Sequence, residues 1–367
     1  MVKKIKELLQ KDTVLVVAVF LGIASSFYSF PQLSYIDFGV LSVLLSLMLV
    51  VAGLKEIKFL DWVAVELLKL CSAERQLAIA LVGITYISSM FVTNDVALLT
   101  FVPLALVIGK SLKLDMARIV ILQTMAANLG SMFTPPGNPQ NLFLFAHYGY
   151  TAVGFFKVMA VPTIISIVLL GVLLSRGRNR SFVLQLSSLP TPEKKLTVIY
   201  ILLLLLNIAA VLRFVDKYLA LAITAAFIAV LQRGLFKKVD YSLLITFIGF
   251  FIFIGNISKS EIVSYLQQSV LGSASGTYMA GILASQVISN VPAAMLLAGL
   301  TTEADALLLG VNVGGLGTLI ASMASVISYK LFCAEHPWLT GQYLKMFLYY
   351  NFAGLLIVGG LTYIALL

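Results

Sequence analysis

Long apolar runs recur along the whole chain and set the strongest limit on its fold. Three of them cover residues 36–54, 151–175 and 343–367, and a helix needs about 20 apolar residues to cross a bilayer. The runs are continuous rather than alternating, which disfavours a porin-type barrel. Charged residues make up only 11% of the chain, against about 25% in soluble domains. The sequence therefore predicts an all-α polytopic protein of the lipid bilayer.

The basic residues indicate how the chain is oriented. The net charge of +9 does not indicate a nucleic-acid partner, because the lysines and arginines are spread over short loops. A cytoplasmic N-terminus places all but four of the 25 lysines and arginines on the inner side of the membrane, as the positive-inside rule requires. The exceptions are Lys157, Arg213, Lys217 and Lys259. We expect about nine spans plus two hairpins in the inner membrane, a retained first span at 13–29, and the C-terminus outside.

One charged side chain interrupts the apolar stretch 76–109. It is Asp95, which follows Thr93 and Asn94. An aspartate in such a run is costly in lipid and indicates a functional site by default, although an Asn-Asp helix cap outside the membrane is the alternative. Basic residues flank the stretch on both sides, which favours a re-entrant hairpin at 75–109 with these three residues at its tip.

The same order of features occurs twice. The run 118–146 is broken at residues 134–139, where three prolines and a glycine cannot continue a helix. In the second half, a hairpin is predicted at 276–300 and a broken helix at 303–333. A shift of 196 residues places Ser89, Thr93, Asn94 and Ala97 on Ser285, Ser289, Asn290 and Ala293. A shift of 184 residues places Asn128, Gly130, Thr134 and Asn138 on Asn312, Gly314, Thr318 and Ser322.

These correspondences predict two repeats, each with a re-entrant hairpin and a discontinuous helix. The first covers 1–180 and the second 218–367, and a linker loop with one extra span lies between them at 181–217. Each repeat has four spans, so the extra span makes the second repeat inverted. Inverted repeats with broken helices that meet near the bilayer midplane are typical of secondary transporters.

The breaks supply the predicted binding groups. Helix starts attract anions, and helix ends attract cations. The predicted substrate-binding residues are Thr93, Asn94, Thr134, Gly137, Asn138, Asn141, Ser289, Asn290, Thr318 and Ser322. The predicted coupling-ion residues are Ser89, Asn94, Asp95, Asn128, Gly130, Ser285, Asn290, Asn312 and Gly314. Glycine and serine in membrane helices also serve close packing, which is the alternative for each of them taken singly.

Asp95 is the one ionisable group predicted at depth. A buried carboxyl can exchange a proton or pair with a cation. Its counterpart in the second repeat is Val291, which indicates a coupling role rather than symmetric substrate contact. We expect no cofactor, and Na⁺ or H⁺ as the coupling ion, with Na⁺ at the hairpin tips. Neither hairpin nor broken helix contains a buried arginine or lysine, which favours a small, weakly charged or neutral oxyanion over a tricarboxylate.

Four short stretches resemble motifs of the ion transporter superfamily. Two of them are the predicted tips, Thr93-Asn94-Asp95-Val96-Ala97 and Ser289-Asn290-Val291-Pro292. The other two belong to the first broken helix, Asn128-Leu129-Gly130-Ser131 and Gly137-Asn138-Pro139-Gln140-Asn141. The group contains arsenite permeases, NhaD-type sodium/proton antiporters and dicarboxylate carriers, and the chain looks most like YbiR-like anion permeases. Asn138 and Gln140 depart from the family's Gly-Thr-Pro-Pro-Asn pattern. The resemblance implies a scaffold and a transport module, a homodimer, and an elevator-type movement.

These observations predict an ion-coupled secondary transporter of a small anion. The alternative is a sodium/proton antiporter that uses Asp95. A passive channel would not need paired breaks. We do not expect an enzyme, because the sequence contains no His-Glu-x-x-His motif and no paired intramembrane aspartates. It also has no Gly-x-x-x-x-Gly-Lys-Ser/Thr motif, so a primary pump would need a partner subunit.

Overall fold

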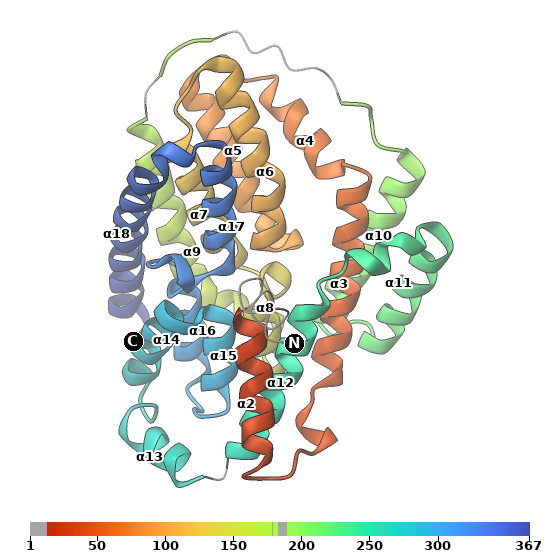
Figure 1. The fold of residues 1–367 in the computed structure, drawn as a ribbon, viewed down its shortest axis with the longest axis vertical. Coiled ribbons are helices and arrows are strands. Elements are labelled where there is room, and N and C mark those ends of the chain that lie inside the picture. Colours follow the sequence, from red (N-terminus) through yellow and green to blue (C-terminus); the bar gives the residue numbers. More distant parts are fainter. Residues whose placement is uncertain (1–12, 178, 183–188, 259) are drawn as a thin grey trace.

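Nearly every element of the chain is a helix (Figure 1). The computed structural model describes residues 13–177, 179–182, 189–258 and 260–367. Within that part, the β-structure is one isolated bridge between Ala73 and Ser181. The all-α prediction is therefore confirmed. The basic N-terminal segment, residues 183–188 of the predicted linker, Arg178 and Lys259 lie outside the described residues.

Six of the described helices are long and apolar enough to cross a membrane. They cover 38–56, 74–92, 94–112, 152–175, 194–211 and 337–366. Four shorter apolar helices cover 14–26, 217–231, 241–257 and 304–313. An integral membrane protein with several spans is thus confirmed, and the count of nine spans plus two hairpins stays a prediction.

Two pairs of helices are each joined by a single residue. Helix α5 (Glu74–Val92) meets α6 (Asn94–Leu112) at Thr93, and α14 (Ala274–Ile288) meets α15 (Asn290–Ala298) at Ser289. The partners of each pair pack against each other. In Figure 1 the first pair lies in the upper half of the molecule and the second in the lower half. Both turns fall at the tips that the sequence predicted.

The first pair is longer than predicted. The sequence placed the end of its second arm near residue 109, which would be short for a span, whereas α6 continues through Lys110 to Leu112. A lysine is favourable in the last turn of a helix, because the helix dipole is negative there. Each arm therefore has 19 residues, so arm length no longer argues for a re-entrant course. That course stays a prediction.

Two helices are interrupted near the centre of the molecule. The first interruption separates α7 (Ala117–Ser131) from α8 (Pro139–His147), with the short helix η2 (Pro135–Gly137) between them. The second separates α16 (Ala304–Val313) from α17 (Met323–Glu335), with η4 (Leu319–Ala321) between them. Prolines start both η2 and α8, where the missing N–H of proline costs no helical hydrogen bond. The first interruption contains the proline-rich segment at which the sequence predicted a break, and the second lies within the broken helix predicted at 303–333.

The remaining long helices pair across the two halves. Helix α2 (Thr13–Ser26) packs closely on α12 (Tyr241–Ile257), and α11 (Lys217–Leu231) packs on α3 (Phe38–Glu56), which also contacts α10 (Lys194–Val211). A Cβ atom added at Gly249 of α12 would lie 2.7 Å from the carbonyl oxygen of Ala18. Small residues of this kind let membrane helices approach closely.

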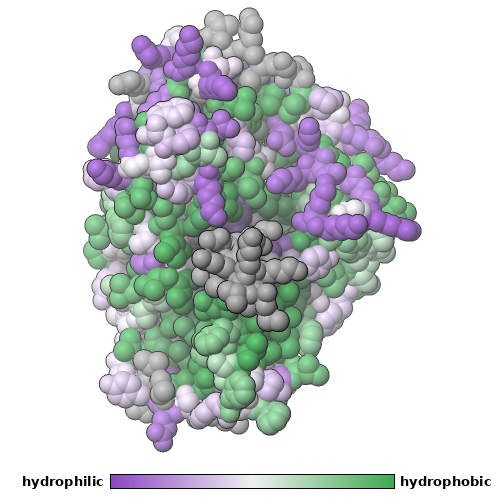
Figure 2. Space-filling view, viewed as in Figure 1, coloured by the Kyte–Doolittle hydropathy of each residue, from purple (hydrophilic) through white to green (hydrophobic). Residues whose placement is uncertain are grey.

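The outer elements complete the shape. Helix α9 (Ala152–Ser175) packs on α18 (Thr340–Leu366) at the left of Figure 1, beside the interrupted helices. The amphipathic stretches 57–71 and 259–271 contain the short helices α4 (Phe59–Leu68) and α13 (Glu261–Ser269). Figure 2 shows hydrophilic residues gathered at the upper end and right edge of the molecule, above a mostly hydrophobic surface.

Candidate functional site

Both turns between paired helices have the same unusual backbone. Thr93 has φ 73° and ψ 153°, and Ser289 has φ 74° and ψ 153°. Residues with a side chain rarely adopt this region, which costs about 1–3 kcal/mol. The two positions are 196 residues apart, the shift that the sequence comparison used. The shared geometry agrees with the predicted repeat, and the inverted arrangement of the two halves stays a prediction.

The strain at Thr93 predicts the direction in which a glycine substitution changes stability. Thr93→Gly relieves the positive φ, and glycine loses more chain entropy on folding by about 0.5–1 kcal/mol. We therefore expect the free energy of unfolding to rise by about 1 kcal/mol, seen as a higher melting temperature in detergent. Ser88→Gly in α5 is the matched control, because the residue has helical geometry and the same change lowers stability there. A lower melting temperature in Thr93→Gly would contradict this account of the turn.

Five helices begin around one small cavity. Its volume is about 160 Å³, and it is lined by N-cap or first-turn residues of α6, α8, α12, α15 and α17. The lining residues used below are Asn94, Asp95, Gln140, Asp240, Ser289, Asn290 and Ser322. We call this space the inner cavity. Each helix start carries roughly half a positive charge and free backbone N–H groups, so the backbone makes the inner cavity attractive to an anion.

A hydrogen-bonded chain of amides and hydroxyls backs the inner cavity. The side chain of Asn94 donates to the Oδ1 atom of Asn128 at 3.1 Å. Ser322 donates to the same oxygen at 2.9 Å. The amide of Asn128 in turn donates to the carbonyl oxygen of Gly315 at 3.3 Å. Asn128 therefore links the tip of the first helix pair to the interruption of the second broken helix.

A second group of amides joins the two broken helices. Asn138 donates to the Oδ1 atom of Asn312 at 3.2 Å, and Asn312 donates to the Oδ1 atom of Asn141 at 2.6 Å. Asn141 also donates to three backbone oxygens of the 131–134 segment. All three asparagines are buried. Most of their hydrogen-bonding capacity is satisfied within the protein, which indicates that they hold the breaks in shape.

Glycines bring the paired helices into contact with the broken ones. A Cβ atom at Gly130 would lie 2.6 Å from the Oγ atom of Ser89, and one at Gly314 would lie 2.9 Å from the Oγ atom of Ser285. The sequence predicted that these two pairs correspond between the repeats. The structure places Gly130 beside Ser89 and Gly314 beside Ser285. None of these four residues lines the inner cavity.

The predicted substrate residues fall into three groups. Asn94, Ser289, Asn290 and Ser322 line the inner cavity, and Thr93 and Asn138 line a larger cavity beside it. Thr134, Gly137, Asn141 and Thr318 line neither. Thr134 donates to the carbonyl oxygen of Met90, and Thr318 donates to that of Gln286. A Cβ atom at Gly137 would lie 2.1 Å from the carbonyl oxygen of Ser131.

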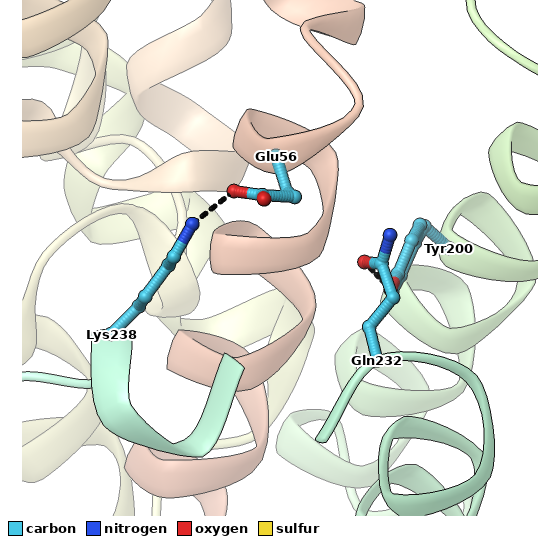
Figure 3. Close-up of polar contacts among 4 residues, drawn as sticks. All are labelled: Glu56, Tyr200, Gln232 and Lys238. Atoms are coloured by element: carbon cyan, nitrogen blue, oxygen red, sulfur yellow. Dashed lines mark hydrogen bonds and ion pairs between the residues drawn. The ribbon is translucent and has the colours of Figure 1, made fainter. Parts of the chain in front are cut away.

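The larger cavity, of about 630 Å³, connects the site to the end of α3. Its lining includes Thr93, Asp95 and Asn138, and also Lys55, Glu56 and Lys238. We call it the outer cavity. Figure 3 shows the ion pair between Lys238 and Glu56, which joins the short helix η3 (Arg233–Lys238) to α3. In the same view Tyr200 donates to the Oε1 atom of Gln232 at 2.6 Å.

Asp240 and Gln140 are among the residues of the inner cavity that were not predicted as site residues. Asp240 is the N-cap of α12 and accepts hydrogen bonds from the backbone N–H groups of Ser242 and Leu243. Gln140 is one of the two residues that depart from the family pattern, and it is only 1% exposed. A departure at a motif position was a usable signal for Gln140. Asp240 stands before an apolar run like any helix cap, so the sequence contained no comparable signal for it.

Comparison with known proteins identifies the family. A family model described as CitMHS, citrate transporter, matches residues 5–327. The inner membrane protein YbiR of Escherichia coli is 31% identical over 343 residues, 90% of either chain. The uncharacterized transporter MJ0456 of Methanocaldococcus jannaschii is 33% identical over 291 residues, 78% of either chain. The putative transporter arsB of Dictyostelium discoideum is 28% identical over 141 residues, 38% of this chain and 25% of its own.

The helical architecture and these matches define an integral membrane protein of the transporter class. Within that class, the chain belongs to the CitMHS citrate transporter family, whose model covers most of its length. The predicted resemblance to the arsenite permease, NhaD and dicarboxylate carrier group, and to YbiR in particular, is thereby confirmed.

Proposed function

We propose that the protein is an ion-coupled secondary transporter that moves a small anion across the inner membrane. The observation that carries the proposal is the inner cavity, where five helix starts meet around one space of about 160 Å³. Its described lining contains no lysine, arginine or histidine, so an anion there would be held by backbone N–H groups, amides and hydroxyls. The family's name makes citrate the first substrate to test. The small volume and lack of basic side chains favour an anion with fewer charges.

The movement and assembly belong to the same proposal. Helices α3, α10 and α11 would form the scaffold, and the paired and broken helices would move against them as an elevator. The outer cavity, between α3 and the first tip, supports this division, because it is the space that such a movement would close. The homodimer, the cytoplasmic N-terminus and the external C-terminus are part of the proposal.

The test is uptake into proteoliposomes, with Na⁺ and pH gradients imposed one at a time. We expect saturable uptake of arsenite, sulfate, phosphate, citrate or another carboxylate that depends on one of the gradients. Uptake that is saturable but indifferent to both gradients would contradict coupling. Unsaturable flux would indicate a channel.

A sodium/proton antiporter is the second candidate. It is favoured by Asp95, whose Oδ1 atom is buried and has no hydrogen-bond partner in the described part of the chain. An antiporter would use this carboxylate to exchange Na⁺ for H⁺. It predicts Na⁺-driven proton flux in proteoliposomes without any added anion, lost in Asp95→Asn. Proton flux that requires the anion would favour the first candidate.

A further inference from the structure

A further cavity lies at the opposite end of α3 from the Lys238–Glu56 ion pair. It is formed by the start of α3, the end of α8 and the turn that joins α10 to α11. Its volume of about 430 Å³ is in the usual range of ligand pockets, about 300–1,000 Å³. We call it the turn cavity. The transport function proposed above does not involve it.

Two cations, Arg213 and Lys217, line the turn cavity. Among the described residues, neither belongs to an ion pair within 4.0 Å. The guanidinium of Arg213 donates to the carbonyl oxygen of Phe145 at 3.5 Å and lies 5.6 Å from the centre of that ring. This contact uses one of its five N–H donors. The ammonium of Lys217 lies against Gly39, where an added Cβ atom would be 1.7 Å from Nζ. In the described part of the chain, both cations therefore keep donors for an anionic ligand.

Both basic residues occupy positions that local structure disfavours. Arg213 follows the end of α10 with a φ of 67°, in a turn closed by the hydrogen bond from the N–H of Phe214 to the carbonyl oxygen of Ala209. Glycine is the usual residue there. Lys217 is the first residue of α11, where the helix dipole disfavours a cation. Both also lie on the predicted outer side, against the positive-inside rule. Departures of this kind from local preference are expected at functional positions.

The charges of the turn cavity leave a positive excess. Asp37 and Asp216 contribute two negative charges, and each carboxylate caps a helix start by accepting from two backbone N–H groups. Those two helix starts contribute roughly half a positive charge each. With Arg213 and Lys217 added, the sum is about one positive charge. The ligand that neutralises this excess is a monoanion such as a phosphodiester.

Exposed aromatic side chains indicate the source of the anion. Phe214 and Tyr218 belong to the same turn and are 78% and 50% exposed. Exposed aromatic residues of membrane proteins concentrate at the level of the lipid headgroups. The turn cavity is therefore beside the level at which phospholipids carry their phosphate groups.

We propose that the turn cavity binds the phosphate group of an anionic phospholipid, with Arg213 and Lys217 as the residues that hold it. A bound headgroup would contact the α10–α11 turn, α3 and α8 together, and would thereby stabilise their packing. This inference goes beyond the proposed function and does not depend on which anion the protein transports.

The experiment is thermal unfolding of the purified full-length protein in a neutral detergent, with increasing amounts of dioleoylphosphatidylglycerol. Parallel series use dioleoylphosphatidylcholine, which has the same acyl chains and no net charge, and inorganic phosphate, which has no acyl chains. We expect a saturable rise in melting temperature with phosphatidylglycerol alone. An equal rise with inorganic phosphate would overturn the lipid as the ligand. An equal rise with phosphatidylcholine, or no rise with any lipid, would overturn the site.

Two substitutions test the side chains. Arg213→Gly removes the guanidinium and suits the left-handed backbone, and Lys217→Met removes the ammonium and keeps the apolar stem. Each should weaken the apparent affinity for phosphatidylglycerol about fivefold, the effect of one basic residue near an anionic lipid surface. Without lipid, both variants should melt at or above the temperature of the unchanged protein, because neither native residue suits its position. Loss of lipid binding is thereby separated from loss of folding.

The matched control is Lys157→Met. Lys157 is exposed on α9, on the same predicted side of the membrane, and does not line the turn cavity. This variant should bind phosphatidylglycerol as the unchanged protein does. Equal weakening in Lys157→Met and Lys217→Met would overturn the site, because it would reflect a general attraction of lysines to anionic lipid. Unchanged affinity in both Arg213→Gly and Lys217→Met would overturn it as well.

Discussion

Asp95→Asn is expected to abolish ion-driven accumulation of the anion while the protein remains folded. The substitution keeps the shape of the side chain and removes its negative charge at the junction of the two cavities. Interactions with a charged group contribute about 1.5–3 kcal/mol, so affinity for the coupling ion should fall by about tenfold to a hundredfold. The measurement is the initial rate of uptake into proteoliposomes as a function of the driving ion gradient.

Asp115→Asn is the control for this prediction. Asp115 accepts from the backbone N–H of Ala117 at 2.9 Å and does not line either cavity. Uptake by this variant should match that of the unchanged protein. Normal gradient dependence in Asp95→Asn would remove Asp95 from the coupling mechanism.

Gly130→Ala is expected to destabilise the contact between α5 and α7. The new Cβ atom would lie 2.2 Å from the carbonyl oxygen of Tyr86 and 2.6 Å from the Oγ atom of Ser89. The backbone oxygen cannot move without moving α5, and overpacking of this kind typically costs about 1–3 kcal/mol. We expect a lower melting temperature in detergent and a large loss of uptake, because α5 ends at the first tip.

Gly83→Ala is the matched control, since it adds the same methyl group to α5 where no atom lies within 4 Å. It should leave stability unchanged or raise it, because alanine is the better helix former by about 1 kcal/mol. If Gly130→Ala behaved like Gly83→Ala, the close approach at Gly130 would not be needed for the fold.

The sequence predicted the main elements because their signals are local. Prolines at 135, 136 and 139 exclude a continuous helix whatever surrounds them, and the break appears there. The turns at Thr93 and Ser289 were found because a polar residue within an apolar run is conspicuous. The end of α6 was predicted too early. Lys110 was interpreted as the boundary of the apolar segment, but a lysine is also favourable in the last turn of a helix.

The arrangement of the site could not be predicted in the same way. Asp240 reaches the inner cavity because α12 lies beside the tips of α6 and α15, and only tertiary packing decides that. Likewise, Asn128 and Asn312 share one expected role in the sequence but have different partners in the structure. The hydrogen bonds of these two asparagines depend on which oxygen atoms tertiary packing brings next to them. Local sequence patterns do not contain that information.

The crossed pairing of α2 with α12 and of α11 with α3 has a consequence for biosynthesis. Helix α2 leaves the ribosome before the other described helices, and its main partner follows more than 200 residues later. At roughly 5–20 residues per second, α2 waits on the order of ten seconds or more in the membrane before it can dock. During that time its small-residue face at Gly22 is open to other helices. Membrane chaperones would therefore act on this chain at the earliest of its described helices.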